Sequence, residues 1–414
     1  MRRFFVATNF VETIRPIYYW TKAVGLISFT ADFERKTIRR NFKDVLIFVV
    51  FLFLNGFLAV TAGIKPSDGN PTYFNSPLIE FILNLFLTLQ LVAMIGIPIV
   101  NYFNVDRYDR FIRYIVDVDE GLHKLGHRHD YSSEYFNCTI YMVGSVVLQF
   151  GCLSGMVISN PFRVDFETGE NIIVLISFLM CNMVYITSTC YCCASLWVVV
   201  YRYRKLNETF SSYFHTNRQS KKQLLLISEK ETIKTIALLY SKLGAAVQMY
   251  NKCFFIHIFY VLGSAFGLNL VCFFTMIHLF LMRGDKFDHI DPIITSQIFL
   301  SVFYMLVVLQ IMFAGNLMHK RAKHTAVLLH KVVVYNDCSS TVLEQLISFS
   351  IQLSHQIPKA SCYFYDIDWK FLLGMISSFA TYLNILVQFD IIQVRAELGK
   401  INRTILAFDK NEYV

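Results

Sequence analysis

A stripe of polar side chains runs along the last apolar segment of the chain, which reads Thr-Tyr-Leu-Asn-Ile-Leu-Val-Gln-Phe at 381–389. Inside a bilayer no water satisfies a hydroxyl or an amide, so polar groups there need a partner or a water-filled path. The spacing i, i+4, i+7 and i+11 places four of them on one face of a helix: Ser377, Thr381, Asn384 and Gln388. The pattern predicts either the wall of a pore or a seam between helices.

Other patterns that carry chemistry are weak in this sequence. It contains no Gly-rich phosphate loop, no nucleophile elbow and no paired carboxylates, so neither an enzyme nor a cofactor is predicted. His123, His127 and His129 lack a neighbouring Cys or carboxylate at zinc spacing, which favours a solvated cytosolic helix or turn over a metal site. None of the ten cysteines falls clearly in an external loop, so no disulfide framework is expected.

The composition is that of a polytopic membrane protein. Of 414 residues, 55% are hydrophobic and 16% charged, with a mean hydropathy of +0.46, whereas about a quarter of the residues in a soluble domain are charged. About 20 apolar residues cross a bilayer. The three longest runs, near 76, 171 and 253, exceed this need and are expected to tilt or to extend into the cytosol. Seven segments qualify as spans: 44–64, 76–103, 136–159, 171–200, 253–282, 293–318 and 369–389.

The distribution of positive charge predicts the orientation. Thirty of the 38 Lys and Arg residues fall on the side of the membrane that holds the N-terminus, and the side richer in Lys and Arg is the cytosolic one. The prediction is an all-α membrane protein with seven transmembrane helices, a cytosolic N-terminus and an extracellular C-terminus. The net charge of +8 then reflects cytosolic loops that face anionic membrane lipid, not nucleic acid.

Two apolar stripes lie in the predicted cytosolic connections. One follows an amphipathic helix from Thr341 to Gln356, and the other follows the segment after the fourth span. They either cover the membrane underside or pack on each other, or they form a bundle in which subunits meet. The stripes are Val342, Leu346, Phe349 and Leu353, and Ile233, Ile236, Leu239, Tyr240 and Leu243.

The external loops are too short to form a ligand-binding domain, so a ligand would enter between the outer halves of the spans. Amides and aromatic rings in those halves suit a small organic molecule. Taken singly, each of these residues more often makes a hydrogen bond between helices than a ligand contact. The candidates are Asn84, Gln149, Asn182, Tyr185, Asn269, His278, Gln297 and Tyr304.

Two stretches near the C-terminus carry a family resemblance. Thr381-Tyr382, five residues and Gln388-Phe389 look like the signature of the insect gustatory receptors. The approach to this span, Phe349 to His355 and Tyr365-Asp366-Ile367-Asp368, is similar to that family as well. Asp366 and Asp368 also suit the start of the last helix, where carboxylates cap free amides.

The resemblance implies a ligand-gated, non-selective cation channel in the plasma membrane of sensory neurons, on the dendrite, axon and cell body. A homotetramer, or a heteromer with related receptors, would set four last spans around one axis. Gln388 and Phe389 look like the gate, and Thr381, Asn384 and Ile385 line the wall near them. Tyr382 would brace the helix, and Asp390 would add a ring of carboxylates that concentrates permeant cations. Asn384 departs from the family, which usually has an apolar residue there.

The expected organisation is one integral domain over residues 1–414. Ligand-sensing helices and their cytosolic extensions occupy 44–340, the anchor and pore helices 341–390, and an extracellular tail 391–414, where Asn402 is a possible glycosylation site.

Two other classes compete with a channel that opens for a tastant. A metabotropic receptor of the G-protein-coupled type would have an external N-terminus, and Asp106-Arg107-Tyr108 follows the second span here, not the third. A secondary transporter would show inverted repeats and intramembrane charges, which the sequence lacks. The last span also lacks the Thr-Tyr-Glu variant of the sweet-sensing branch, which favours a bitter, aversive ligand over a sugar.

Overall fold

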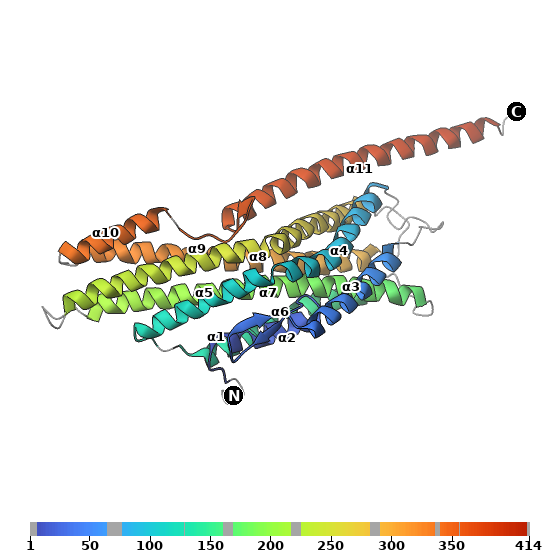
Figure 1. Ribbon diagram of the computed structural model, residues 1–414. Coiled ribbons are helices and arrows are strands. Elements are labelled where there is room, and N and C mark those ends of the chain that lie inside the picture. The colour runs from blue at the N-terminus through green and yellow to red at the C-terminus, as the bar shows by residue number, and fades with distance from the viewer. Residues whose placement is uncertain are drawn as a thin grey trace.

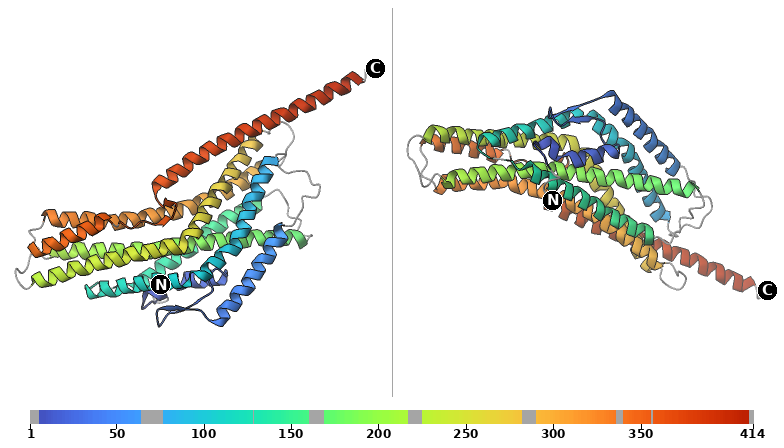
Figure 2. Two further views of the ribbon diagram at one scale, coloured as in Figure 1. Left: turned by 45° about the horizontal axis from the view of Figure 1, so that its top comes forward. Right: turned by 90° about the horizontal axis from the view of Figure 1, so that it is seen from below.

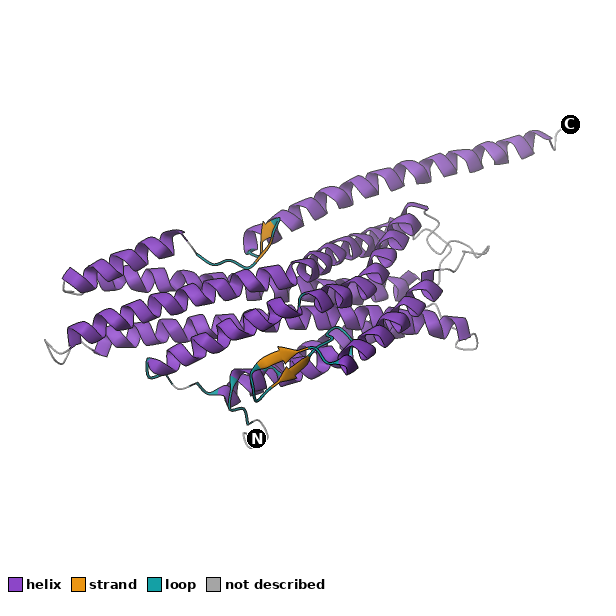
Figure 3. Cartoon of the chain, in the orientation of Figure 1, coloured by secondary structure: helices purple, strands orange, loops and turns teal. Residues whose placement is uncertain are grey.

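The computed structural model describes residues 6–63, 77–127, 129–159, 169–216, 225–281, 290–335, 340–355 and 357–411. This part of the chain is almost entirely helical (Figure 1). Its helices are α1 (Phe10–Thr13), α2 (Arg15–Ala23), α3 (Phe42–Gly63), α4 (Pro77–Phe103), α5 (Val105–Lys124), α6 (Tyr131–Ser159), α7 (Gly169–Thr216), α8 (Leu225–Leu281), α9 (Ile290–Tyr335), α10 (Ser340–His355) and α11 (Trp369–Asn411). Two antiparallel hairpins are the strands of Figure 3: β1 (Thr30–Asp32) with β2 (Thr37–Arg39), and β3 (Ser361–Cys362) with β4 (Tyr365–Asp366).

Three very long helices form the core. α7, α8 and α9 contain 48, 57 and 46 residues, which at 1.5 Å per residue is about 70–85 Å. A bilayer interior is only about 30 Å thick, so each helix continues well beyond it. The excess length predicted for the segments near 171 and 253 is confirmed. The equal extension of α9 beyond its predicted end at 318 was not foreseen.

The described helices suffice for most of the predicted spans. Five are long and apolar enough to cross a membrane, or six when α4 and α5 count as one bent span. α3, with 22 residues, also has the required length. The count of seven spans remains a prediction.

A bend separates α4 from α5. The two helices meet at Asn104 at an angle of 61°, where the Asn104 side chain accepts a hydrogen bond from Arg107. Tyr108 is buried one turn into α5 and donates to Asn101 across the bend. The tripeptide Asp106-Arg107-Tyr108 therefore belongs to an ordinary helix start.

The N-terminal segment forms a cover over one side of the bundle. α1, α2 and the β1–β2 hairpin lie against α5, α6 and α7 (Figure 2). The Tyr18 hydroxyl donates to the Phe29 carbonyl at 3.1 Å, and Lys22 forms an ion pair with Asp44 at 2.8 Å. The first contact holds the cover together, and the ion pair attaches it to the start of α3.

α10 buries the predicted stripe against α8 and α9. Val342, Leu346, Phe349 and Leu353 are all buried, as are the five apolar residues of the second stripe, which lie on α8. Of the alternatives, the structure shows the two stripes packed on each other, because α10 and this part of α8 are in contact and the Phe349 and Tyr240 rings lie 5.8 Å apart. A bundle in which subunits meet stays a prediction.

Candidate functional site

α11 is attached to the bundle along one side only. It runs beside the C-terminal half of α8 and then projects past the other helices (Figures 1 and 2). Asp368 caps its start by accepting from the Phe371 amide at 2.9 Å, as predicted, whereas Asp366 binds Lys359 instead. Ile367, just before the helix, packs on Gly315 of α9: a Cβ at Gly315 would lie 2.6 Å from Ile367 Cγ2.

The polar stripe of α11 faces away from the rest of the chain. Its four residues are exposed, and hydrogen bonds run along it from Thr381 to the Ser377 carbonyl (3.1 Å) and from Gln388 to Asn384 (3.5 Å). The side that touches α8 carries Phe379, whose ring lies 5.3 Å from that of Phe273. At about 100° per residue, Phe379 lies roughly opposite Thr381 and Gln388 on the helix. The stripe is therefore turned toward whatever surrounds this chain.

The predicted gate residues are divided between these two sides. Phe389 is 63% exposed, and Ile385 is exposed next to it. Tyr382 is 53% exposed, but its ring lies 6.2 Å from that of Phe266 of α8, edge to face. Asp390 is only 5% exposed and lies on the α8 side, about 160° around the helix from Gln388.

Asp390 contacts one of the predicted ligand residues. Its Oδ2 lies 2.6 Å from Nδ1 of His278 on α8, and both side chains are buried. From the sequence, the carboxylate was expected in a cation-concentrating ring and the imidazole in a ligand site. In this structure the two groups contact each other. The proposals below therefore use neither the carboxylate ring nor the imidazole as a ligand contact.

Several other predicted ligand residues are bonded between helices. Gln149 of α6 donates to Gln310 of α9 at 3.2 Å, and Asn269 of α8 accepts from Ser301 of α9 at 2.8 Å. Asn182 is buried in α7 and Gln297 is partly buried in α9. Gln149 and Asn269 therefore form hydrogen bonds between helices, which is the alternative to ligand contact.

The structure brings two predicted residues together in an aromatic cluster. The rings of Tyr185 (α7) and Tyr304 (α9) meet edge to face at 5.5 Å, with Phe303 and Tyr260 within 6 Å of Tyr185. Both hydroxyls are bonded: Tyr185 donates to the Val261 carbonyl at 2.8 Å, and Tyr304 accepts from Gln90 of α4 at 3.0 Å. Four helices thus contribute to one buried group of ring faces and amides. Gln90 was missed by sequence reasoning, although it is an amide in a span just like the residues that were chosen.

Two predicted residues lie outside the described side chains. Asn84 belongs to α4 and Asn402 to the distal part of α11, but only their backbone is described. α11 continues as a helix to Asn411, so residues 391–411 extend the last helix where the sequence analysis expected a tail.

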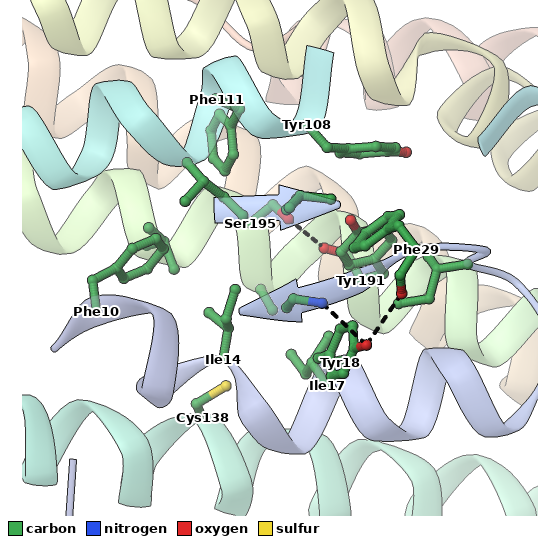
Figure 4. A pocket seen from close by; sticks show the side chains of 16 residues that line it. Phe10, Ile14, Ile17, Tyr18, Phe29, Tyr108, Phe111, Cys138, Tyr191 and Ser195 are labelled. Carbon is green, nitrogen blue, oxygen red and sulfur yellow. Dashed lines mark hydrogen bonds between the residues drawn. The ribbon is translucent and has the colours of Figure 1, made fainter. Parts of the chain in front are cut away.

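An apolar cavity lies away from all these residues, beneath the N-terminal cover (Figure 4). Phe10, Ile17 and Tyr18 line it from the cover, and Tyr108 and Tyr191 from α5 and α7. Its volume is about 50 Å³, a third of the roughly 150 Å³ in which a protein core holds benzene. In this conformation it is too small for an aromatic ligand.

A buried ion cluster holds the same region together and was not foreseen. Arg202 of α7 is fully buried and binds Asp119 of α5 (2.9 Å) and Glu134 of α6 (3.2 Å). His129 lies 3.5 Å from Asp119, and burial lowers its pKa to about 4 despite the nearby carboxylate. The expectation of a solvated histidine is therefore wrong for His129. Within the described residues, no group of His, Cys, Asp or Glu has the arrangement of a metal site.

Residues 14–393 match the family model of the 7tm chemosensory receptors. The chain belongs to the 7tm chemosensory receptor family. The match covers the core, α10 and the cover apart from α1, and the gustatory branch stays a prediction. This membrane protein is a receptor and not an enzyme.

The chemosensory receptor shares its fold with an insect receptor of known structure. It is similar to the olfactory receptor OR5 from Machilis hrabei in complex with eugenol, with a TM-score of 0.63 over 90% of this chain and 98% of that chain at 10% identity. A second OR5 structure gives 0.62 over the same shares at 12% identity. No curated protein sequence matches this one. The insect chemoreceptor assignment is thus confirmed, and the fold is that of an insect olfactory receptor.

Proposed function

We propose that this receptor is a ligand-gated cation channel of the gustatory type, opened by a small-molecule tastant at the plasma membrane of a sensory neuron. The observation that carries the proposal is the geometry of α11. It is long and apolar enough to cross a membrane, yet none of its most apolar 18 residues is buried. Its polar stripe faces away from the chain. A helix with this surface needs lipid on some sides and water on the striped side.

Four copies around one axis supply both environments. With the N-terminus in the cytosol, as the charge distribution predicts, the four stripes line a common path. α10 keeps Ile347 and Ile351 exposed although its other face is buried, so it offers apolar surface at which the copies meet. Homomeric and heteromeric assembly both use these surfaces.

The gate in this proposal lies at Gln388 and Phe389. Four exposed Phe389 rings close a narrow path by excluding water from it, since dewetting depends on radius and on surface polarity. Ile385, Asn384 and Thr381 form the wall below the ring, and Tyr382 braces the helix on Phe266.

The ligand site in this proposal is the aromatic cluster of Tyr185 and Tyr304 with the Gln90 amide. Ring faces with a few amides suit a small organic molecule, and the related fold of OR5 was solved in complex with eugenol. A tastant here opens the channel only if it binds the open arrangement more tightly than the closed one. We assign the ligand to bitter, aversive compounds; a receptor that responds to sugars alone contradicts this assignment.

The test of the channel needs no ligand. Phe389→Ala removes the apolar ring and is expected to produce a resting cation current in cells that express only this chain, without added nucleotide. Gln388→Ala is expected to change ion selectivity while surface expression persists. A silent Phe389→Ala receptor at normal surface level places the gate elsewhere, and loss of surface expression in Gln388→Ala indicates a seam between helices.

A further inference from the structure

We infer that His278 and Asp390 form a latch that couples α8 to the gate segment of α11; the inference rests on the channel proposed above. Nδ1 of His278 and Oδ2 of Asp390 are 2.6 Å apart, and the two side chains are 3% and 7% exposed. A buried acid and imidazole at this distance form a strong, directional contact.

The latch lies where the two helices must act together. Asp390 directly follows Phe389, so its position sets that of the proposed gate ring. His278 lies one turn before α8 ends at Leu281. The same helix carries Val261, whose carbonyl accepts from Tyr185 in the aromatic cluster. α8 therefore runs continuously from the proposed ligand site to the proposed gate.

Burial makes the contact hard to release. Pulling a buried carboxylate away from an imidazole that it contacts costs free energy, so separating α11 from α8 at this level is unfavourable. Earlier along the seam, Phe379 meets α8 through the rings of Phe266 and Phe273, and ring contacts tolerate sliding better than a directional polar bond. A shift of α8 upon ligand binding is thus transmitted to Asp390 and Phe389.

The functional test is a double-mutant cycle on the resting current, in cells that express only this chain. His278→Ala and Asp390→Ala are each expected to raise the current about fivefold or more, in the range of typical coupling between sites. The double variant is expected to raise it no further than either single change. Asp390→Asn keeps a hydrogen-bonding group and is expected to stay nearer the parent, and the exposed His324→Ala serves as the control that changes nothing.

A second arm tests the contact without any current. The full-length receptor, purified in detergent, is unfolded by heat with and without Cd²⁺. The double variant His278→Cys with Asp390→Cys is expected to gain several degrees in unfolding midpoint from Cd²⁺, whereas neither single variant gains.

The outcomes separate the latch from the channel. Additive single effects, or unchanged currents while Phe389→Ala still conducts, overturn the latch and leave the channel standing. If no variant conducts, Phe389→Ala included, the channel fails and the gating role of the latch fails with it. Absence of a Cd²⁺ effect in the double cysteine variant overturns the contact itself.

Discussion

α7 and α11 have nearly the same hydropathy and opposite surroundings. Within Leu179–Ser212 of α7, the most apolar 18 residues have a mean hydropathy of 1.7, and 78% of them are buried. Within Trp369–Ile392 of α11, the most apolar 18 residues have a mean hydropathy of 1.5, and none of them is buried. Hydropathy alone therefore does not separate a helix that forms the core from one that lies on the surface of the chain. The position of polar side chains does: Asn182, Thr187, Ser188 and Thr189 of α7 are buried, whereas Ser377, Thr381, Asn384 and Gln388 of α11 are exposed.

The largest expected effect lies on the packed side, at Arg202. Arg202→Met leaves Asp119 and Glu134 buried without their cation, and breaking such a pair costs about 3–5 kcal/mol. The change is expected to abolish surface expression or to lower the unfolding midpoint strongly in purified receptor. Arg204 is the matched control: it is 57% exposed and pairs with Glu208, so Arg204→Met is expected to cost less than about 1 kcal/mol. Equal effects of both changes refute a structural role for the buried cluster.

A pair of glycines compares the two regions directly. At Gly315 of α9 a Cβ would lie 2.7 Å from the Ile367 carbonyl oxygen, whereas at Gly374 of α11 nothing lies within 4 Å. Gly315→Ala is expected to destabilise by about 1–3 kcal/mol through overpacking. Gly374→Ala is expected to be neutral or to stabilise by up to about 1 kcal/mol, since alanine favours the helix. Thermal unfolding of purified protein measures both; a costly Gly374→Ala indicates close packing of α11 against a second copy.

The effect that is smallest at neutral pH concerns His129. Its pKa is lowered to about 4 by burial, below the value of about 6.5 in an unfolded chain. The unfolded state therefore binds the proton more readily, and stability falls as pH drops from about 6.5 toward 4. His129→Gln removes this contribution, so its unfolding midpoint is expected to fall less than that of the parent over this range. Parallel pH profiles of the two proteins contradict the buried, neutral histidine.

The sequence predicted buried residues correctly where the buried positions repeat along a single helix. The stripe from Val342 to Leu353 is buried at each predicted position because an amphipathic helix carries its own period. It failed where a partner comes from far along the chain. His278 and Asp390 are 112 residues apart, and nothing in either segment alone shows that the carboxylate turns toward α8. The cluster around Arg202 was missed for the same reason, since its members come from three helices.

The most direct test of the account asks which face of α11 meets water in the assembled receptor. Single cysteines are placed on the stripe, at Ser377, Thr381, Asn384 and Gln388, and on the α8 side, at Phe379 and Leu386, in the Phe389→Ala receptor. Cells that express only this chain are then treated from outside with a charged thiol reagent, and labelling is measured against the parent, whose described cysteines are buried or partly buried. A water-filled path predicts labelling at the stripe positions and little at Phe379 and Leu386. An unlabelled stripe, or equal labelling on both faces, contradicts the assignment of α11 as the pore helix.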